Sequence, residues 1–252
     1  MAVNHLGIDA GQLEGATLAL LPGDPARVGL IAATLDDPAA LATEREFTTW
    51  RARSGGTPVV VTSTGIGGPS LSIAVEELAQ LGVRTFVRVG TTGAIQPSIA
   101  PGDVIISTGA VRLEGASRHF APPEYPAVAD FGVTGALIEG AVANDITFHL
   151  GITASSDTFY PGQERHDTYR GYVLPELHGS LTMWRALGVL NYEMEAATLF
   201  VMASTMRLRA GAVSGVILNR AETESLADGA VAMAEQNAVL VATSAAGLLV
   251  EL

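Results

Sequence analysis

An arginine inside an apolar strand is the first feature of this sequence that could do chemistry. Residues 85–89 are β-branched or aromatic on either side of Arg88, which predicts a core strand. Residues 90–93 follow as a turn rich in glycine and threonine, whose backbone a ligand could approach closely. A buried guanidinium is costly unless an anion meets it. The partner of Arg88 is therefore either a carboxylate of the fold or a bound anion, and this stretch alone favours neither.

A loop after a predicted strand over 149–154 carries groups that suit a flat heterocycle. Phe159, Gln163 and Arg165 place an aromatic ring, an amide and a guanidinium within one short segment. An aromatic face stacks on a planar ring, an amide both donates and accepts, and a guanidinium only donates. This set fits a base that has carbonyl groups beside an N–H. The alternative is a loop with one buried phenylalanine and two solvated polar side chains.

Two carboxylates flank a methionine where a short apolar strand near residue 190 turns into a long helix. These residues are Glu193, Met194 and Glu195. A carboxylate at an apolar junction needs hydrogen bonds, and one carboxylate can accept from two adjacent hydroxyls of a ribose. The alternative is an acid placed at a helix start by the helix macrodipole.

Three further positions carry weaker signals. Gly23 and Arg27 lie between a predicted strand (17–21) and a predicted helix (28–35), an arrangement that can present backbone N–H groups to an anion. The turn over 65–68 lacks the third glycine of a dinucleotide fingerprint at the required spacing, and no acidic residue ends a following strand, so we reject that interpretation. His5 lies in a short polar arm, where a lone histidine is usually only solvated.

The elements that must position these residues alternate between strand and helix. Predicted strands cover residues 17–21, 43–53, 58–63, 85–89, 102–107 with 111–113, 149–154 and 212–218. Predicted helices cover residues 28–35, 70–81, 133–143 and 230–249, besides the helix that follows Glu195. This alternation predicts one α/β domain over residues 1–252, with three layers and with the functional groups at the strand ends.

Composition narrows the classes of function. The chain has 252 residues, 48% hydrophobic and 16% charged, so it should form a large core and hide some surface in an oligomer. A net charge of -12 argues against nucleic acid and anionic membranes as partners. The sequence has no cysteine and no lysine, which excludes disulfides, thiolate catalysis, Schiff bases and a phosphate-loop lysine. Without a leader-like start or a long apolar run, the chain is expected to be soluble and cytoplasmic.

Seven segments, taken in order, resemble the uridine phosphorylases of the bacterial hexameric type, within the nucleoside phosphorylase family. They are LPGDPAR (21–27), REFTTWR (45–51), STGIGGPS (63–70), VRVGTTGAI (87–95), DTFYPGQER (157–165), NYEMEAATL (191–199) and GVILNR (215–220). Each segment is only moderately specific, whereas the ordered set is highly specific. The resemblance implies a nucleoside phosphorylase-like fold with a mixed central sheet. It also implies reversible phosphorolysis of uridine to uracil and ribose 1-phosphate in pyrimidine salvage.

The resemblance also implies a role for each matching position. The phosphate site would be formed by Gly23, Arg27, Arg88 and Thr91, with Arg45 lent by a neighbouring subunit. The ribose would be bound by Thr91, Glu193, Met194 and Glu195, with His5 of the neighbour as a donor to the 5′-hydroxyl. The base would be bound by Phe159, Gln163, Arg165, Ile217, Leu218 and Arg220. Catalysis would rest chiefly on Arg88, Glu195, Arg165 and Gln163.

Cofactors and assembly follow from the same resemblance. Phosphate would be the co-substrate and no organic cofactor is implied. A monovalent cation, K⁺, would lie at a dimer interface at the positions of Glu46, Ile66 and Ser70. The implied assembly is a homo-oligomer, a hexamer built as a trimer of dimers, with sites shared between subunits. A nucleoside and phosphate would be the small-molecule partners.

Three rival functions remain open at this stage. A purine nucleoside phosphorylase of the same fold would carry an aspartate after the last core strand, where this chain has Ile217, Leu218, Asn219 and Arg220 instead. A nucleosidase, which uses water, would not need Arg27, Arg45 and Arg88 together. A nucleoside-binding protein without catalysis could keep the pocket but lose one functional element, and the matching positions show no such loss.

Overall fold

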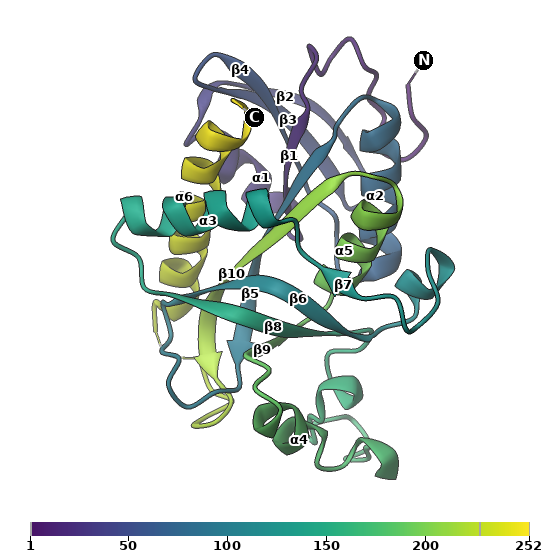
Figure 1. Cartoon of the computed structure of the whole chain (residues 1–252), viewed down its shortest axis with the longest axis vertical. Coiled ribbons are helices and arrows are strands. Elements are labelled where there is room, and N and C mark those ends of the chain that lie inside the picture. Colours follow the sequence, from purple (N-terminus) through teal and green to yellow (C-terminus); the bar gives the residue numbers. More distant parts are fainter. Residues whose placement is uncertain (1, 227, 252) are drawn as a thin grey trace.

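The computed structural model describes residues 2–226 and 228–251, and a mixed β-sheet runs through its centre (Figure 1). Residues 1, 227 and 252 lie outside the described part, and residues 1 and 252 are the two ends of the predicted domain. Helices cover both faces of the sheet, so the α/β class with a mixed sheet is confirmed.

The middle of the sheet is parallel. Strand β1 (Leu18–Pro22) lies between β4 (Thr57–Thr62) and β5 (Thr85–Ala94), and β10 (Arg209–Asn219) pairs with the other edge of β5. On the β4 side the sheet continues through the antiparallel strands β3 (Phe47–Ser54) and β2 (Asp36–Glu44). The carboxyl ends of β1, β5 and β10 therefore meet at one end of the sheet, which is where ligands bind in open α/β sheets.

Beyond β10 the sheet curls back on itself. Strand β6 (Val104–Leu113) pairs antiparallel with β10, and β8 (Phe148–Ser156) pairs parallel with β6. The short β9 (Asn191–Glu193) lies between β8 and β5. Because β5 also pairs with β10, these five strands close into a ring, a feature that a flat three-layer prediction does not contain. A two-residue strand, β7 (Ala127–Val128), pairs with β6.

Two apolar clusters separate the helical layers. On one face, α1 (Pro25–Ala32), α3 (Phe131–Ala143) and α6 (Ala230–Leu249) pack on the sheet around residues such as Ile31, Leu137 and Val241. On the other face, α2 (Gly68–Gln80) and α5 (Ala196–Thr205) pack around Leu71 and Phe200. The remaining helix, α4 (Ser180–Ala186), lies apart from both layers, below β9 in Figure 1. Short 3-10 turns cover Ala116–His119, Pro161–Gln163 and Pro175–Leu177.

Local sequence explains the cap of α1 and the close packing of α6 on β10. Asp24 caps α1, because its side chain accepts a hydrogen bond from the backbone N–H of Ala26, and Pro25 occupies the first turn. On β10, Gly215 lies against α6 so closely that a Cβ there would stand 1.9 Å from the carbonyl oxygen of Ala234. A larger residue would push α6 away from the sheet.

The element predictions need two corrections. The strand predicted over 43–53 is wrong, because the chain turns at Arg45 and Glu46 and the segment divides between β2 and β3. Arg45 has a φ of +53°, a left-handed conformation that reverses the chain and that residue type does not reveal. The turn predicted over 90–93 is also wrong, since β5 continues to Ala94 along its pairing with β10.

Several other elements agree with prediction or extend it. Helix α6 has the predicted bounds, while α1 begins three residues earlier than predicted, at Pro25. Residues 36–42 of β2, strand β7 and helix α4 have no counterpart in the predictions. Within the described ranges, each helix is too short or too polar to cross a lipid bilayer.

Candidate active site

A cavity of about 870 Å³ opens at the carboxyl ends of the parallel strands. It collects residues from seven segments of the sequence. Those segments are the turn before α1 with the first turn of that helix, the β2–β3 turn, the start of α2, strand β5, the loop after β8, the β9–α5 junction and the end of β10 with the loop that follows. The predicted residues that line it are Gly23, Arg27, Glu46, Ile66, Ser70, Arg88, Thr91, Phe159, Gln163, Arg165, Glu193, Met194, Glu195, Ile217 and Leu218.

Arg88 lines this cavity and is almost fully buried. Its Nε donates to Glu193 Oε2 at 3.2 Å, and its Nη2 forms an ion pair with Glu195. The remaining nitrogen, Nη1, is buried and has no hydrogen-bond partner within the described residues. A Cβ at Gly90 would lie 3.2 Å from Nη2, so the glycine leaves room for the guanidinium. Both explanations of Arg88 therefore apply: carboxylates of the fold hold two of its nitrogens, and the third can meet an anion.

Glu193 is fully engaged by protein donors. Its Oε2 accepts the backbone N–H groups of Glu195 at 2.8 Å and Ala196 at 2.9 Å, and its Oε1 accepts the hydroxyl of Ser155. The carboxylate thus satisfies N–H groups at the start of α5. Together with the bond from Arg88, this arrangement fixes the guanidinium and leaves Glu193 little capacity for a ligand.

Glu195 has a different environment, although it lies only two residues further on. Its Oε1 accepts the backbone N–H of Gly67 at 2.5 Å, which ties the β9–α5 junction to the start of α2. Burial is the main cause that raises the pKa of this carboxyl; the nearby Glu193 adds to the effect and Arg88 opposes it. In its ionised form, Glu195 can accept hydrogen bonds from hydroxyl groups within the cavity.

A second guanidinium lines the same cavity from α1. Arg27 is 8% exposed, pairs with Glu235 of α6, and leaves its buried Nε without a partner among the residues described. Gly23 and Thr91 line the cavity beside it. The cavity is therefore lined by two buried guanidiniums, those of Arg27 and Arg88, each with a nitrogen available to an anion.

The loop after β8 supplies the aromatic, amide and guanidinium groups of the cavity. The Arg165 guanidinium lies 4.2 Å from the ring centroid of Phe159, a cation–π contact. Gln163 is 3% exposed and lines the cavity, and its side-chain amide is bonded to none of the described residues. Burial is the main cause that lowers the pKa of Arg165, and repulsion from Arg220 adds to it. Glu224 opposes this shift, because it pairs with Arg165 and accepts from Arg220 Nε at 2.6 Å.

Sequence reasoning missed three residues that contact Arg220 or hold the loop after β8. Tyr192 lines the cavity beneath Arg220, with its ring centroid 5.6 Å from that guanidinium, and burial raises its pKa. Glu224 lies four residues after Arg220, a spacing that could have suggested the pair. Glu164, between Gln163 and Arg165, accepts the backbone N–H groups of Gly179 and Leu181 at the start of α4. No local pattern predicts that contact.

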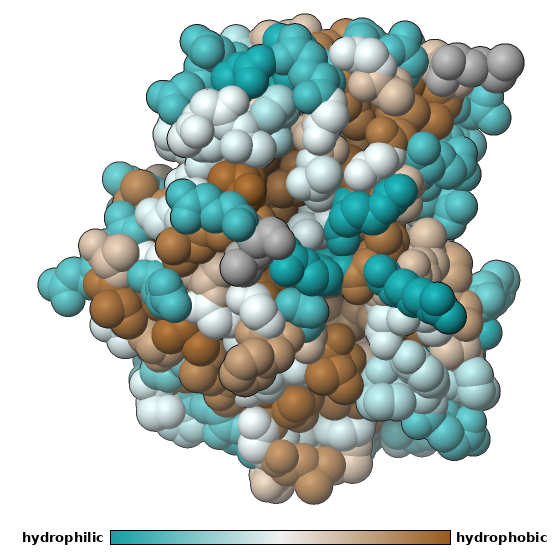
Figure 2. All heavy atoms as spheres, turned by 45° about the horizontal axis from the view of Figure 1, so that its top comes forward, coloured by the Kyte–Doolittle hydropathy of each residue, from teal (hydrophilic) through white to brown (hydrophobic). Residues whose placement is uncertain are grey.

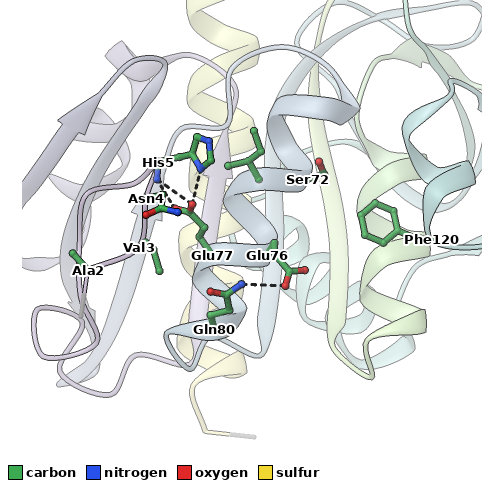
Figure 3. A pocket seen from close by; sticks show the side chains of 10 residues that line it. Ala2, Val3, Asn4, His5, Ser72, Glu76, Glu77, Gln80 and Phe120 are labelled. Carbon is green, nitrogen blue, oxygen red and sulfur yellow. Dashed lines mark hydrogen bonds and ion pairs between the residues drawn. The ribbon is translucent and has the colours of Figure 1, made fainter.

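Three predicted site residues do not line this cavity in their own chain. Arg220 lies behind it and contacts Glu224, which does line it. Arg45 is exposed at the β2–β3 turn, and His5 lines a separate cavity formed by the N-terminal arm and α2 (Figure 3). At the edge of the main cavity, Ser70 Oγ donates to Glu46 Oε1 at 2.8 Å. Within the described ranges no group of three or more His, Cys, Asp and Glu could hold a metal ion.

Comparison with known proteins gives one consistent result. The family model described as the phosphorylase superfamily matches residues 17–252. The chain is 59% identical to a uridine phosphorylase of Escherichia coli (strain K12) over 97% of this chain and 96% of that protein. It is 58% identical to a uridine phosphorylase of Haemophilus influenzae over 98% of both chains. A guanosine phosphorylase of Halorubrum lacusprofundi is 40% identical over 84% of this chain and 81% of that protein.

Proposed function

This chain belongs to the phosphorylase superfamily, and we propose that it catalyses the reversible phosphorolysis of uridine to uracil and ribose 1-phosphate. It would thus be a pentosyltransferase of pyrimidine nucleoside salvage. One observation carries the proposal: a single cavity is lined by two buried guanidiniums, Arg27 and Arg88, by an aromatic–amide–guanidinium set on the loop after β8, and by Glu195. The three groups suit phosphate, a pyrimidine and a ribose respectively.

Phosphate is the group best matched to the guanidiniums of Arg27 and Arg88. A single guanidinium–phosphate pair at about 4 Å contributes roughly 4 kcal/mol at an effective dielectric of about 20. Arginine adds directional N–H donors that lysine does not offer. We propose that Arg45 of a neighbouring subunit completes this cradle, because in its own chain the residue is exposed and outside the cavity.

Cleavage then requires charge stabilisation at both ends of the breaking bond. A phosphate oxygen forms the new bond to C1′ as the bond between C1′ and the base nitrogen breaks through an oxocarbenium-like sugar. The electron pair of the broken bond passes into the uracil, whose carbonyl oxygens become more negative. Gln163 and Arg165 would donate to them, with Arg220 in support, and such donors are commonly worth a few kcal/mol each. Glu195 would hold the ribose hydroxyls in place.

The purine alternative finds less support in the site. Asn219 and Arg220, neither of them an acid, come where β10 ends, and the Asn219 amide donates to the carbonyl oxygens of Gln96 at 2.8 Å and Ile99 at 2.7 Å. Its Oδ1 accepts the backbone N–H of Ala221 at 2.8 Å. The side chain is thus used by the fold and does not line the cavity. The guanosine phosphorylase among the relatives still makes a purine substrate the control to run.

We also propose a homo-oligomer, a hexamer built as a trimer of dimers, with active sites shared between subunits. Large apolar side chains lie at the surface, among them Ile66 at 77% exposed and Phe131 at 93% exposed. Figure 2 shows apolar residues reaching the surface between polar ones on one face. Contacts between subunits would cover such residues. We further propose that the chain folds as one phosphorylase domain and works in the cytoplasm.

A monovalent cation, K⁺, is proposed for the dimer interface. Glu46 and Ser70 form a hydrogen-bonded pair of oxygen donors, and the carbonyl of Ile66 lies in the same segment as Ser70. A backbone N–H and the Ser70 hydroxyl lower the pKa of Glu46, which favours its ionised form. Oxygen ligands of this kind suit a hard cation. Two such half-sites facing each other would form one complete site.

Uridine cleavage, followed by ultraviolet absorbance with and without phosphate, tests the proposed reaction. We expect cleavage only when phosphate is present, with ribose 1-phosphate as the second product. Equal cleavage without phosphate would make the protein a hydrolase. Faster cleavage of guanosine or inosine than of uridine, in the same assay, would establish the purine alternative instead.

A further inference from the structure

We propose that Glu77 orients His5 and fixes its tautomer, so that the neutral imidazole presents Nε2 as a hydrogen-bond acceptor to the ribose 5′-hydroxyl of a neighbouring subunit's nucleoside. The proposal rests on the proposed function and on the position at that hydroxyl which the family resemblance implies for His5. It assigns a positioning role to Glu77 and changes the role of His5 from donor to acceptor.

The contact lies in a second cavity of about 680 Å³ between the N-terminal arm and α2 (Figure 3). Glu77 is on α2 and only 8% exposed. Its Oε1 is 2.7 Å from Nδ1 of His5, and both of its oxygens accept the backbone N–H of His5 at 3.0 Å. Oε2 also accepts the backbone N–H of Leu6 at 2.9 Å. One carboxylate therefore binds both the backbone and the side chain of the arm.

The position of the imidazole proton follows from the charge of Glu77. Burial would raise the pKa of this carboxyl, but hydrogen bonds from His5 and Leu6 outweigh burial and lower it. Glu77 is thus ionised near neutral pH, and an ionised carboxylate only accepts. Nδ1 of His5 must therefore carry the proton that forms the 2.7 Å bond. In the neutral form of the imidazole this is the single N–H, so in that form Nε2 keeps its lone pair and can accept a hydrogen bond.

The arm around His5 is held firmly enough for this orientation to matter. Leu6 and Ile8 are fully buried in the core, and the backbone N–H of Val3 donates to the carbonyl of Ile8 at 2.9 Å. The His5 side chain remains 43% exposed, and within the described residues its hydrogen bond runs through Nδ1, with none formed by Nε2. A primary hydroxyl of a nucleoside can donate to such an acceptor. A second-sphere carboxylate that fixes the tautomer of a histidine is a recurrent device in functional sites.

A substrate comparison separates this role from a structural one. Uridine and 5′-deoxyuridine differ only in the hydroxyl that His5 is proposed to meet. For Glu77→Gln we expect kcat/KM for uridine to fall about five- to tenfold and that for 5′-deoxyuridine by less than about twofold, the difference expected from one hydrogen bond. Glu76→Gln is the matched control, because Glu76 lines the same cavity, is exposed, and bonds only to Gln80. It should change neither value.

His5→Ala is measured first, and it should show the same selectivity for uridine. The double variant of His5 and Glu77 should then lose no more than His5→Ala alone. If His5→Ala is selective and Glu77→Gln lowers both substrates equally, Glu77 has only a structural role and the proposal fails. If His5→Ala reduces both equally, the 5′-hydroxyl contact itself is wrong, which also overturns it. Loss of phosphate-dependent uridine cleavage in the unmodified protein would instead refute the proposed function.

A direct measurement of the tautomer needs no catalysis. The imidazole nitrogen NMR spectrum, with the His5 signals assigned from the spectrum of His5→Ala, is recorded across a pH titration, and the neutral form of His5 should show protonated Nδ1 and unprotonated Nε2. Protonated Nε2 in that neutral form would overturn the proposal, whatever the kinetics show.

Discussion

Glu164 offers the sharpest test of what holds the base-binding loop, which carries Phe159, Gln163 and Arg165, in position. The residue lies between Gln163 and Arg165 but points away from both, toward α4. It accepts the backbone N–H of Leu181 at 2.6 Å and that of Gly179, and the hydroxyl of Ser180 at 3.3 Å. Helix α4 is itself tied to the end of β5, because Arg185 donates through Nε to the carbonyl of Ile95 at 2.7 Å. Glu164 thus connects the base-binding loop to the sheet.

The substitution Glu164→Gln weakens this connection without changing the size of the side chain. An amide has one accepting oxygen, so at least one bond to an N–H is lost, and a bond to a charged group contributes about 1.5–3 kcal/mol. If that free energy holds the loop in its binding conformation, the apparent affinity for uridine falls with the populated fraction. The upper limit is then about ten- to a hundredfold. We expect KM for uridine to rise about tenfold, because the loop keeps its other contacts.

Phosphate provides the internal reference for the assay. Initial rates are measured with uridine varied at saturating phosphate, and then with phosphate varied at saturating uridine. KM for phosphate should change little, since the hydrogen bonds and ion pairs of Arg27 and Arg88 within the described residues are to Glu235, Glu193 and Glu195, none of which is in the loop. Glu176→Gln, an exposed acid in the same loop region, controls for the loss of one negative charge. Equal increases in both KM values, or no change in either, would refute the reasoning.

Three further predictions concern residues that line the cavity. Arg88→Lys keeps a cation beside Glu193 and Glu195 but removes the directional donors, so KM for phosphate should rise at least about tenfold; an unchanged KM would remove Arg88 from the cradle. Gln163→Ala should lower kcat/KM for uridine about a hundredfold while the melting temperature falls by less than about 3 °C; parallel losses would favour a structural role. Since burial raises the pKa of Glu195 and only its ionised form accepts two hydroxyls, KM for uridine should rise as pH falls through that raised pKa. KM for 2′-deoxyuridine should rise less, and identical pH profiles for the two substrates would contradict this role.

The sequence by itself determined which local structures form and which residue types are available. The apolar periodicity of α6, the glycines and prolines at the turns, and the alternation of strand and helix are all local signals, and the corresponding elements were predictable. The ordered motifs also indicated most of the residues that line the cavity. Where local signals conflict, as in the turn at Arg45, prediction failed, because a single left-handed residue leaves no pattern in composition.

Only the tertiary structure decided how these residues are paired. Arg88 and Glu193 are 105 positions apart, and His5 and Glu77 are 72 apart, so no spacing rule connects them. Sequence reasoning left open whether Arg88 meets a carboxylate or an anion, and the closed ring of strands from β5 to β10 settles that it meets two carboxylates and still keeps one nitrogen available. The physical reason is that burial forces each polar group to find a partner wherever the chain brings one within reach. The identity of that partner is a property of the packed fold.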